Sequence, residues 1–181
     1  GTTGKSKGAM MSHKNLFSNA KTLSEIWYIS SSDILLHILP IYHTHGLFVA
    51  IHSMIYAGGS ILFHRNFVIE DVLAALPKVT MLMGVPTHYN RLSMEKSFSK
   101  KATRNIRLLI SGSAPLSSKT HAEIKQKTSL SILERYGMTE TNMITSNPYH
   151  GKRKAGTVGI PLPDVHVRIR DAKTHELVKH G

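Results

Sequence analysis

Hydrophobic residues recur at helical spacing in some segments of this chain and stand together in short runs in others. One helical face follows the N-cap residue Ser12 and consists of Leu16, Ala20, Leu23 and Trp27. Further helices are predicted over residues 46–56, 70–76 and 117–128, and Pro86 opens another that carries His88 and Arg91.

The short apolar runs between these helices predict buried strands. They occupy residues 33–40, 60–63, 79–85, 106–110 and 131–135. Residues 165–171 alternate in the manner of a further strand, before a turn at residues 172–175. Helices that alternate with buried strands are typical of an α/β fold, here with a largely parallel sheet flanked by helices.

The composition is that of a globular domain. Of 181 residues, 41% are hydrophobic and 19% are charged, which suffices to bury a core. No apolar run reaches the roughly 20 residues that cross a bilayer, and the start lacks the order of a signal peptide. We therefore expect no membrane span and a cytoplasmic protein. The absence of cysteine excludes disulfides, thiolate metal sites and a cysteine nucleophile.

The chain carries an excess of basic residues. Its 23 Lys and Arg against 11 Asp and Glu give a formal charge of +12, which suits nucleic acid, an anionic membrane surface or nucleotides. These residues are spread along the chain, with short clusters only at residues 100–101 and 152–154, so nucleic acid is disfavoured as a partner. The close pair His43 and His45 has no Cys or Glu at metal-ligand spacing, and no zinc site is expected.

Unusual polar sequences follow four of the predicted strands. They occupy residues 43–45, 84–87, 111–115 and 136–140. Ligands of parallel sheets bind outside the carboxyl ends of the strands. We therefore expect these four segments to line one cleft.

The first eight residues form a loop rich in Gly, Thr and Lys. Its backbone N–H groups, the hydroxyls of Thr2 and Thr3 and the cation of Lys7 suit phosphate oxygens, although a flexible linker has the same composition. Gly8 stands where a Walker motif has Ser or Thr, which disfavours a P-loop ATPase or GTPase. Because the chain opens inside this motif and Gly181 follows the start of another element, it is interpreted as truncated at both ends.

Residues 136–140 place an aromatic ring, a glycine, a hydroxyl and a carboxylate after the last buried strand. Tyr136 can stack on a base, and Gly137 lets the backbone come close to a ligand. Thr139 and Glu140 supply the hard oxygen ligands that Mg²⁺ accepts. A capped turn with a solvated glutamate is the alternative interpretation.

Together these motifs resemble the acyl-adenylate-forming superfamily of acyl-CoA synthetases, peptide-synthetase adenylation domains and luciferases. Residues 2–8 match its Thr-Thr-Gly-x-Pro-Lys-Gly loop, except that Ser6 replaces the proline. The further matches, in chain order, are residues 40–43, 111–115, 136–140 and 156–161. The resemblance implies that residues 1–181 are a partial AMP-binding domain without its later Thr-Gly-Asp motif and its C-terminal domain, and that this piece alone is nearly inactive.

The resemblance also implies ATP, Mg²⁺ and coenzyme A as ligands of an enzyme that activates a carboxylic acid. ATP would be held by Thr2, Thr3, Gly4, Lys7, Ser113, Ala114, Pro115, Arg135, Tyr136, Gly137 and Thr139. Thr139 would contact the α-phosphate, Glu140 would bind Mg²⁺, and His43 would join them as a catalytic residue. The acyl pocket would include His43, His45, Ser111, Gly112 and Ser113.

Within the superfamily, residues 39–47, 84–92 and 134–143 are most similar to malonyl-CoA synthetases. Arg91 matches their malonate-binding arginine. A second carboxylate buried without a cation costs several kcal/mol, and a guanidinium pairs with it in bidentate fashion. Without the resemblance, Arg91 is interpreted as an exposed residue of an amphipathic helix. Malonate and methylmalonate stay undistinguished, because one methyl group changes binding by only about 1–3 kcal/mol.

Three other hypotheses stay open on the sequence. The first is a medium- or short-chain acyl-CoA synthetase in which Arg91 faces solvent. The second is a basic module that binds a nucleotide or nucleic acid without catalysis. The third is the product of a decayed gene, which the missing proline at Ser6 and the truncation suggest.

Overall fold

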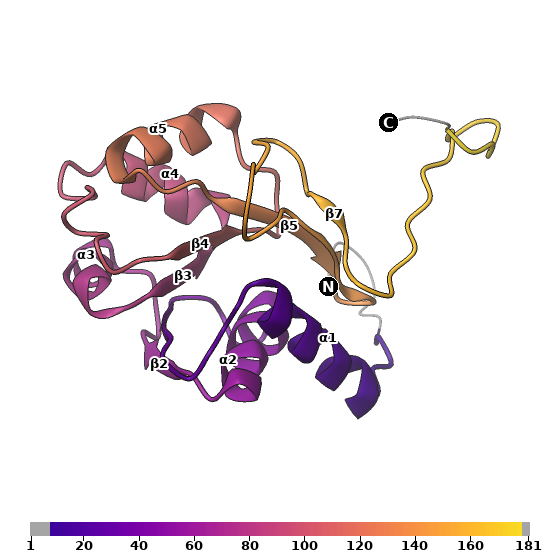
Figure 1. Ribbon diagram of the computed structural model, residues 1–181, viewed down its shortest axis with the longest axis horizontal. Coiled ribbons are helices and arrows are strands. Elements are labelled where there is room, and N and C mark those ends of the chain that lie inside the picture. The colour runs from indigo at the N-terminus through magenta and orange to yellow at the C-terminus, as the bar shows by residue number, and fades with distance from the viewer. Residues whose placement is uncertain (1–7, 179–181) are drawn as a thin grey trace.

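A sheet of seven strands organises the computed structural model, which describes residues 8–178 (Figure 1). The strands lie in the order β2-β1-β3-β4-β5-β6-β7. Neighbours from β2 to β5 are parallel, and β6 and β7 extend the sheet in antiparallel fashion. Their bounds are Ile34–His37 for β1, Ser60–Phe63 for β2, Met81–Gly84 for β3, Leu108–Ser111 for β4, Leu133–Met138 for β5, Asn142–Ser146 for β6 and Ile160–Pro161 for β7.

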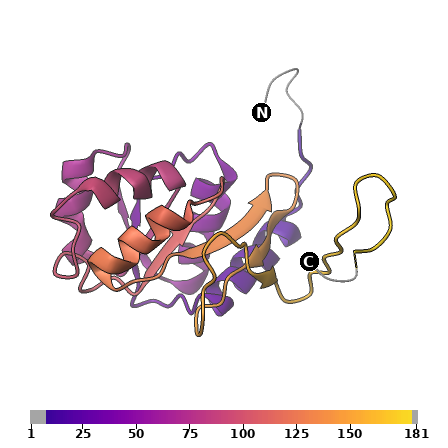
Figure 2. The same cartoon turned by 90° about the horizontal axis from the view of Figure 1, so that it is seen from above.

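Helices cover both faces of the parallel part of this sheet. On one face lie α1 (His13–Ile26), the π-helical segment η1 (His45–Ile51) and α2 (His52–Ala57). On the other face lie α3 (Ile69–Ala75), the short 3₁₀ turn η2 (Leu76–Lys78), α4 (Pro86–Met94) and α5 (Ser118–Thr128), as Figures 1 and 2 show. The predicted α/β fold with a largely parallel sheet is confirmed.

The core lies in two layers, one on each face of the sheet. Leu35 and Leu36 are adjacent in β1 and fully buried, yet they belong to different apolar clusters. Leu35 packs in the cluster that contains Trp27, the residue that follows α1, and Leu36 in the one that contains Leu92 of α4. Successive side chains of a strand point to opposite faces. A strand covered on both faces must therefore be apolar at every position, which is why these strands appear as short apolar runs.

The predicted start of α1 and the helical segment after β1 are confirmed in the structure. The Ser12 hydroxyl accepts a hydrogen bond from the Asn15 amide at 3.1 Å, as an N-cap does. The second segment begins at His45, one residue before the predicted position, and its first turns are π-helical. Gly46 packs directly on the carbonyl of Pro40, where any side chain would collide.

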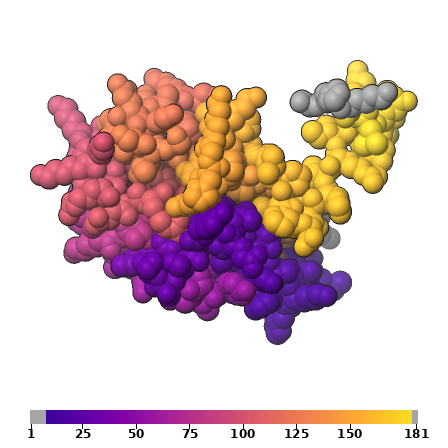
Figure 3. All heavy atoms as spheres, viewed as in Figure 1, coloured from indigo at the N-terminus to yellow at the C-terminus, as the bar shows by residue number. Residues whose placement is uncertain are grey.

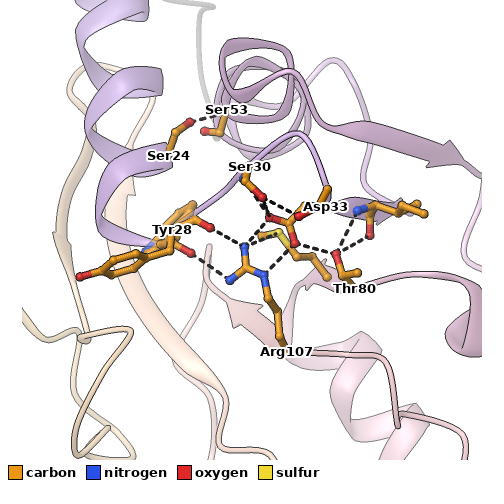
Figure 4. A network of polar contacts seen from close by, with 11 residues as sticks. Ser24, Tyr28, Ser30, Asp33, Ser53, Thr80 and Arg107 are labelled. Carbon is orange, nitrogen blue, oxygen red and sulfur yellow. Dashed lines mark hydrogen bonds and ion pairs between the residues drawn. The ribbon is translucent and has the colours of Figure 1, made fainter.

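An ion pair between the buried Asp33 and the partly exposed Arg107 fixes the amino-terminal edge of the sheet (Figure 4). Asp33 accepts hydrogen bonds from Arg107 at 2.6 and 2.7 Å, from the Thr80 hydroxyl at 2.8 Å and from the Ser30 amide at 2.9 Å. Arg107 also donates to the carbonyl of Tyr28 at 2.9 Å. The starts of β1, β3 and β4 are thereby tied to the end of α1, on the edge opposite the polar loops.

The strand predicted over residues 131–135 is wrong in its bounds. β5 begins two residues later and continues through Met138, because β6 pairs with it in antiparallel fashion. Strand β6 was not predicted from the sequence. Tyr136 and Gly137 therefore lie within the strand, and Thr139 and Glu140 lie in the hairpin turn that follows it.

The strand predicted over residues 165–171 is also wrong. This segment forms only a single bridge, between Arg170 and Leu177. The turn after it is present, and the Asp171 carboxylate accepts hydrogen bonds from the amides of Lys173 and Thr174, each at 2.8 Å. Leu162 and Val165 still pack on the core, and residues 166–178 stand away from the body of the molecule (Figures 1 and 3). Alternation alone therefore did not produce a strand, because no neighbouring strand of the described chain lies against this segment.

Candidate active site

Polar side chains gather where β1, β3, β4 and β5 end. The loop after β1 meets the hairpin after β5, where the Thr44 hydroxyl donates to the Thr139 hydroxyl at 3.3 Å. The same loop meets the segment after β4, where His45 Nδ1 and the Ser113 hydroxyl lie 3.2 Å apart. Three of the four predicted polar segments are therefore in direct contact.

The fourth segment, after β3, reaches the same place through His88. A side chain at Gly84, the last residue of β3, would meet the His88 side chain at 3.5 Å. Gly84 is paired with Ser111 of β4. His88 also lies close enough to His45 to contribute to lowering its pKa. All four segments thus meet at one edge of the sheet.

Arg135 is a buried cation at this edge. Its side chain is 4% exposed, and its Nε and Nη2 atoms have no hydrogen-bond partner among residues 8–178. Its guanidinium lies against Gly112, where a Cβ would collide with it. Burial lowers the pKa of Arg135 to about 10, so the group keeps its charge at neutral pH. No carboxylate of the described chain forms a salt bridge with it.

His45 is a buried base that feels the charge of this cation. Burial holds the pKa of His45 well below 6.5, and the positive charge of Arg135 together with His37, His88 and His43 lowers it further. The imidazole is therefore neutral at physiological pH. Its Nε2 atom has no partner within the described chain, and neither has the buried hydroxyl of Ser111. The site thus offers unpaired hydrogen-bonding groups and one fixed positive charge.

The remaining predicted residues lie around this buried group and are more exposed. His43 is exposed beside the Tyr42 ring, with ring centroids 4.7 Å apart. Ser113 has a left-handed backbone with φ of 70°, which is unusual for a residue with a side chain. The other exposed members are Ala114, Pro115, Tyr136, Thr139 and Glu140. Thr2, Thr3, Gly4 and Lys7 lie outside the described residues.

Arg91 is an exposed residue of α4, and its guanidinium carbon lies 4.8 Å from the centroid of the Phe67 ring. His88 stacks on the same ring with centroids 4.3 Å apart. Sequence reasoning did not find Phe67, which lies in the loop after β2 and belongs to no motif.

The segment 156–161 is fastened to β5 by a buried carboxylate. Glu134 is 7% exposed and accepts a hydrogen bond from the Gly156 amide at 2.9 Å. The Asn147 side-chain amide donates to the carbonyls of Glu134 and Thr157. Neither Glu134 nor Asn147 was predicted from the sequence to have a role. The available signal was a charged residue, Glu134, inside the strand predicted over residues 131–135.

The family to which the chain belongs follows from a comparison over its full length. The model of the family described as "AMP-binding enzyme" matches residues 1–181. The chain belongs to the AMP-binding enzyme family. The resemblance drawn from the motifs is thereby confirmed at the family level.

The chain is also similar to individual members of this family. The chain is 38% identical to the malonate–CoA ligase of Arabidopsis thaliana, over 94% of this chain and 31% of that protein. It is 35% identical to a mitochondrial malonate–CoA ligase of Mus musculus, over 93% of this chain and 32% of that protein. The structure superposes on ATP-bound MatB from Rhodopseudomonas palustris with a TM-score of 0.96 and 51% identity, over 99% of this chain and 36% of that chain.

The chain spans about a third of the length of these AMP-binding relatives. No helix among residues 8–178 is long and apolar enough to cross a membrane. The mouse relative is named as mitochondrial, so the cytoplasmic location of this protein stays a prediction. The ligand assignments of individual residues also stay predictions.

Proposed function

We propose that the protein containing this chain activates malonate or methylmalonate with ATP and transfers the acyl group to coenzyme A. The observation that supports this most is Arg135, a buried cation without a carboxylate partner in the described chain. An uncompensated buried charge costs several kcal/mol in a folded protein, at an order-of-magnitude level. A dicarboxylic acid supplies the missing negative charge, and the names of the relatives point to the same acid.

The two carboxylates of such an acid have different tasks. One pairs with Arg135, and Arg91 reaches it from α4, while the neutral His45 and the hydroxyls of Ser111 and Ser113 complete its hydrogen bonds. The other carboxylate stays free to react beside Thr139. A fatty acid has only the reacting carboxylate, so its binding would leave the Arg135 charge buried and unpaired. The site therefore favours the dicarboxylate.

The proposed reaction is adenylation followed by thiolysis. A carboxylate oxygen attacks the α-phosphorus of ATP, the bond from that phosphorus to pyrophosphate breaks, and an acyl-adenylate forms. The thiol sulfur of coenzyme A then attacks the acyl carbon, loses its proton, and AMP leaves. Positioning and charge neutralisation carry such catalysis. Thr139, held by Thr44, contacts the α-phosphate in this scheme.

The residues present fit a magnesium ion that is shared with ATP. Glu140 is exposed in the turn after β5 and forms no salt bridge within residues 8–178, and Thr139 adds a hydroxyl beside it. The described chain brings no three His, Asp or Glu side chains together around a metal. One carboxylate, phosphate oxygens and water are the ligands that Mg²⁺ prefers. When bound, Mg²⁺ would neutralise charge on the triphosphate.

Replacing Arg91 tests the proposed acid. In the complete gene product, Arg91→Ala is expected to raise the KM for malonate about 10- to 100-fold, the effect of losing a hydrogen bond to a charged group. The KM for ATP should stay unchanged, because Arg91 does not contact ATP in this scheme. Steady-state pyrophosphate release measures both constants.

A matched control is Arg104→Ala. Arg104 is an exposed arginine in the loop before β4, at the opposite edge of the sheet, and its loss should change neither constant. An equal rise of the KM for malonate and for ATP in the Arg91 variant would count against the assignment.

A further inference from the structure

We propose that Phe67 is a positioning residue that holds the guanidinium of Arg91 in place to bind the non-reacting carboxylate of the substrate. This inference rests on the proposed function, which gives Arg91 that carboxylate. Arg91 is exposed and has no salt bridge within the described chain. Its guanidinium carbon lies 4.8 Å above the Phe67 ring, which is within the range of a cation–π contact.

His88 fixes the ring that Arg91 contacts. It lies three residues before Arg91 on α4, so both side chains project from the same side of the helix. The His88 and Phe67 rings are parallel within 1°, with centroids 4.3 Å apart. Burial, together with the positive charge of Arg91, lowers the pKa of His88 to about 4. His88 is therefore neutral and does not repel the arginine at physiological pH.

Phe67 is anchored to the core on its other side. It is half-buried and packs against the apolar cluster that contains Leu36 and Leu92. The ring therefore connects a rigid part of the fold to an exposed cation. Contact through the flat face of a guanidinium leaves its N–H groups, which lie in the plane, free to donate to a carboxylate.

The contact with Phe67 pre-organises the Arg91 side chain for binding an anion. A long exposed side chain loses rotamer freedom when it binds an anion, and a contact that restrains it beforehand reduces that loss. Arg135 is restrained by burial, whereas Arg91 has no such burial and depends on Phe67. The loop between β2 and α3, which no motif marks, thereby contributes to substrate selectivity.

The decisive variant is Phe67→Leu in the complete gene product, because leucine keeps the apolar packing and removes the ring. We expect the KM for malonate to rise about 2- to 5-fold, the size of an exposed cation–π contact. The kcat and the KM for ATP should not change. The separate variant Phe67→Tyr keeps an aromatic ring, and its KM for malonate should equal that of the native protein. Phe63→Leu is the matched control, because Phe63 stacks on His37 and not on Arg91.

Two comparisons separate positioning from a general structural effect. In an Arg91→Ala background, Phe67→Leu should cause no further rise in the malonate KM. An equal rise with and without Arg91, or no rise in the otherwise native protein, would overturn the proposal.

A chemical readout distinguishes failure of this inference from failure of the proposed function. Phenylglyoxal modifies accessible arginines, and mass spectrometry gives the rate at Arg91. Phe67→Leu should increase that rate and Phe67→Tyr should not. If the native protein does not activate malonate but the rate still rises, the proposed substrate is wrong and the contact is confirmed. An unchanged rate means that Phe67 does not hold Arg91.

Discussion

Replacing Arg135 with methionine is expected to make the protein more stable and nearly inactive with malonate. Removal of a buried, uncompensated charge should raise the free energy of unfolding by about 1–3 kcal/mol. Loss of the partner of a buried carboxylate should lower kcat/KM for malonate about 100- to 1,000-fold. A gain in stability with a loss of activity is the trade-off expected where a site keeps a destabilising charge for its function.

The measurements are urea unfolding and steady-state kinetics of the complete gene product. Arg135→Lys keeps the charge but loses the bidentate geometry. We expect its stability and its kcat/KM for malonate to lie between those of the native protein and the methionine variant. The resemblance also places Arg135 among the ATP-binding residues. If Arg135→Met raises the KM for ATP and leaves selectivity for malonate unchanged, the arginine serves the nucleotide and the proposed acid loses its main support.

Replacing Asp33 with alanine is expected to cause the largest loss of stability. Asp33 is 2% exposed and accepts five hydrogen bonds, two of them from Arg107. Burial works against its charge, but the hydrogen bonds from Arg107, Ser30 and Thr80 outweigh burial and lower the pKa of Asp33 below 3.8. Breaking one partner of a buried pair costs about 3–5 kcal/mol.

The unfolding midpoint in urea measures this loss, and its pH dependence identifies the carboxylate. A group whose pKa is lower in the folded protein stabilises above its unfolded pKa, and this stabilisation is lost as the pH falls through the folded value. The native protein should therefore lose the contribution of Asp33 below about pH 4, while the variant lacks it at every pH. In the double variant Asp33→Ala/Arg107→Met, part of the stability should return. A loss below about 1 kcal/mol would show that the pair does not hold the sheet edge.

The sequence predicted the elements of the fold well where burial determines them. Leu35 and Leu36 are apolar because helices cover both faces of β1, and such a run indicates a buried strand without knowledge of its neighbours. Residues 165–171 alternate as well, but pairing depends on a partner strand, and the sequence of the segment does not reveal one. The extension of β5 through Met138 went unpredicted for the same reason, because it depends on β6.

The candidate site was predicted in position but not in its electrostatics. The motifs placed Thr44, Ser113 and Thr139 at one sheet edge, and their side chains meet there. The burial of Arg135 in β5 depends on the close approach of Gly112, which follows the neighbouring strand β4. The contact between Phe67 and Arg91 likewise joins the loop after β2, which carries no motif, to helix α4. The residue pattern within one segment does not predict contacts between separate segments.

The most direct test of the proposed activity is ATP- and Mg²⁺-dependent release of pyrophosphate by the complete gene product. Malonate, methylmalonate, acetate and octanoate are compared side by side, and acyl-CoA formation is followed by mass spectrometry. We expect release with malonate, or with malonate and methylmalonate, and little with the two monocarboxylates. Release with acetate or octanoate instead would keep the adenylating reaction and contradict the dicarboxylate, and no release with any of the four acids would contradict the proposed activity itself.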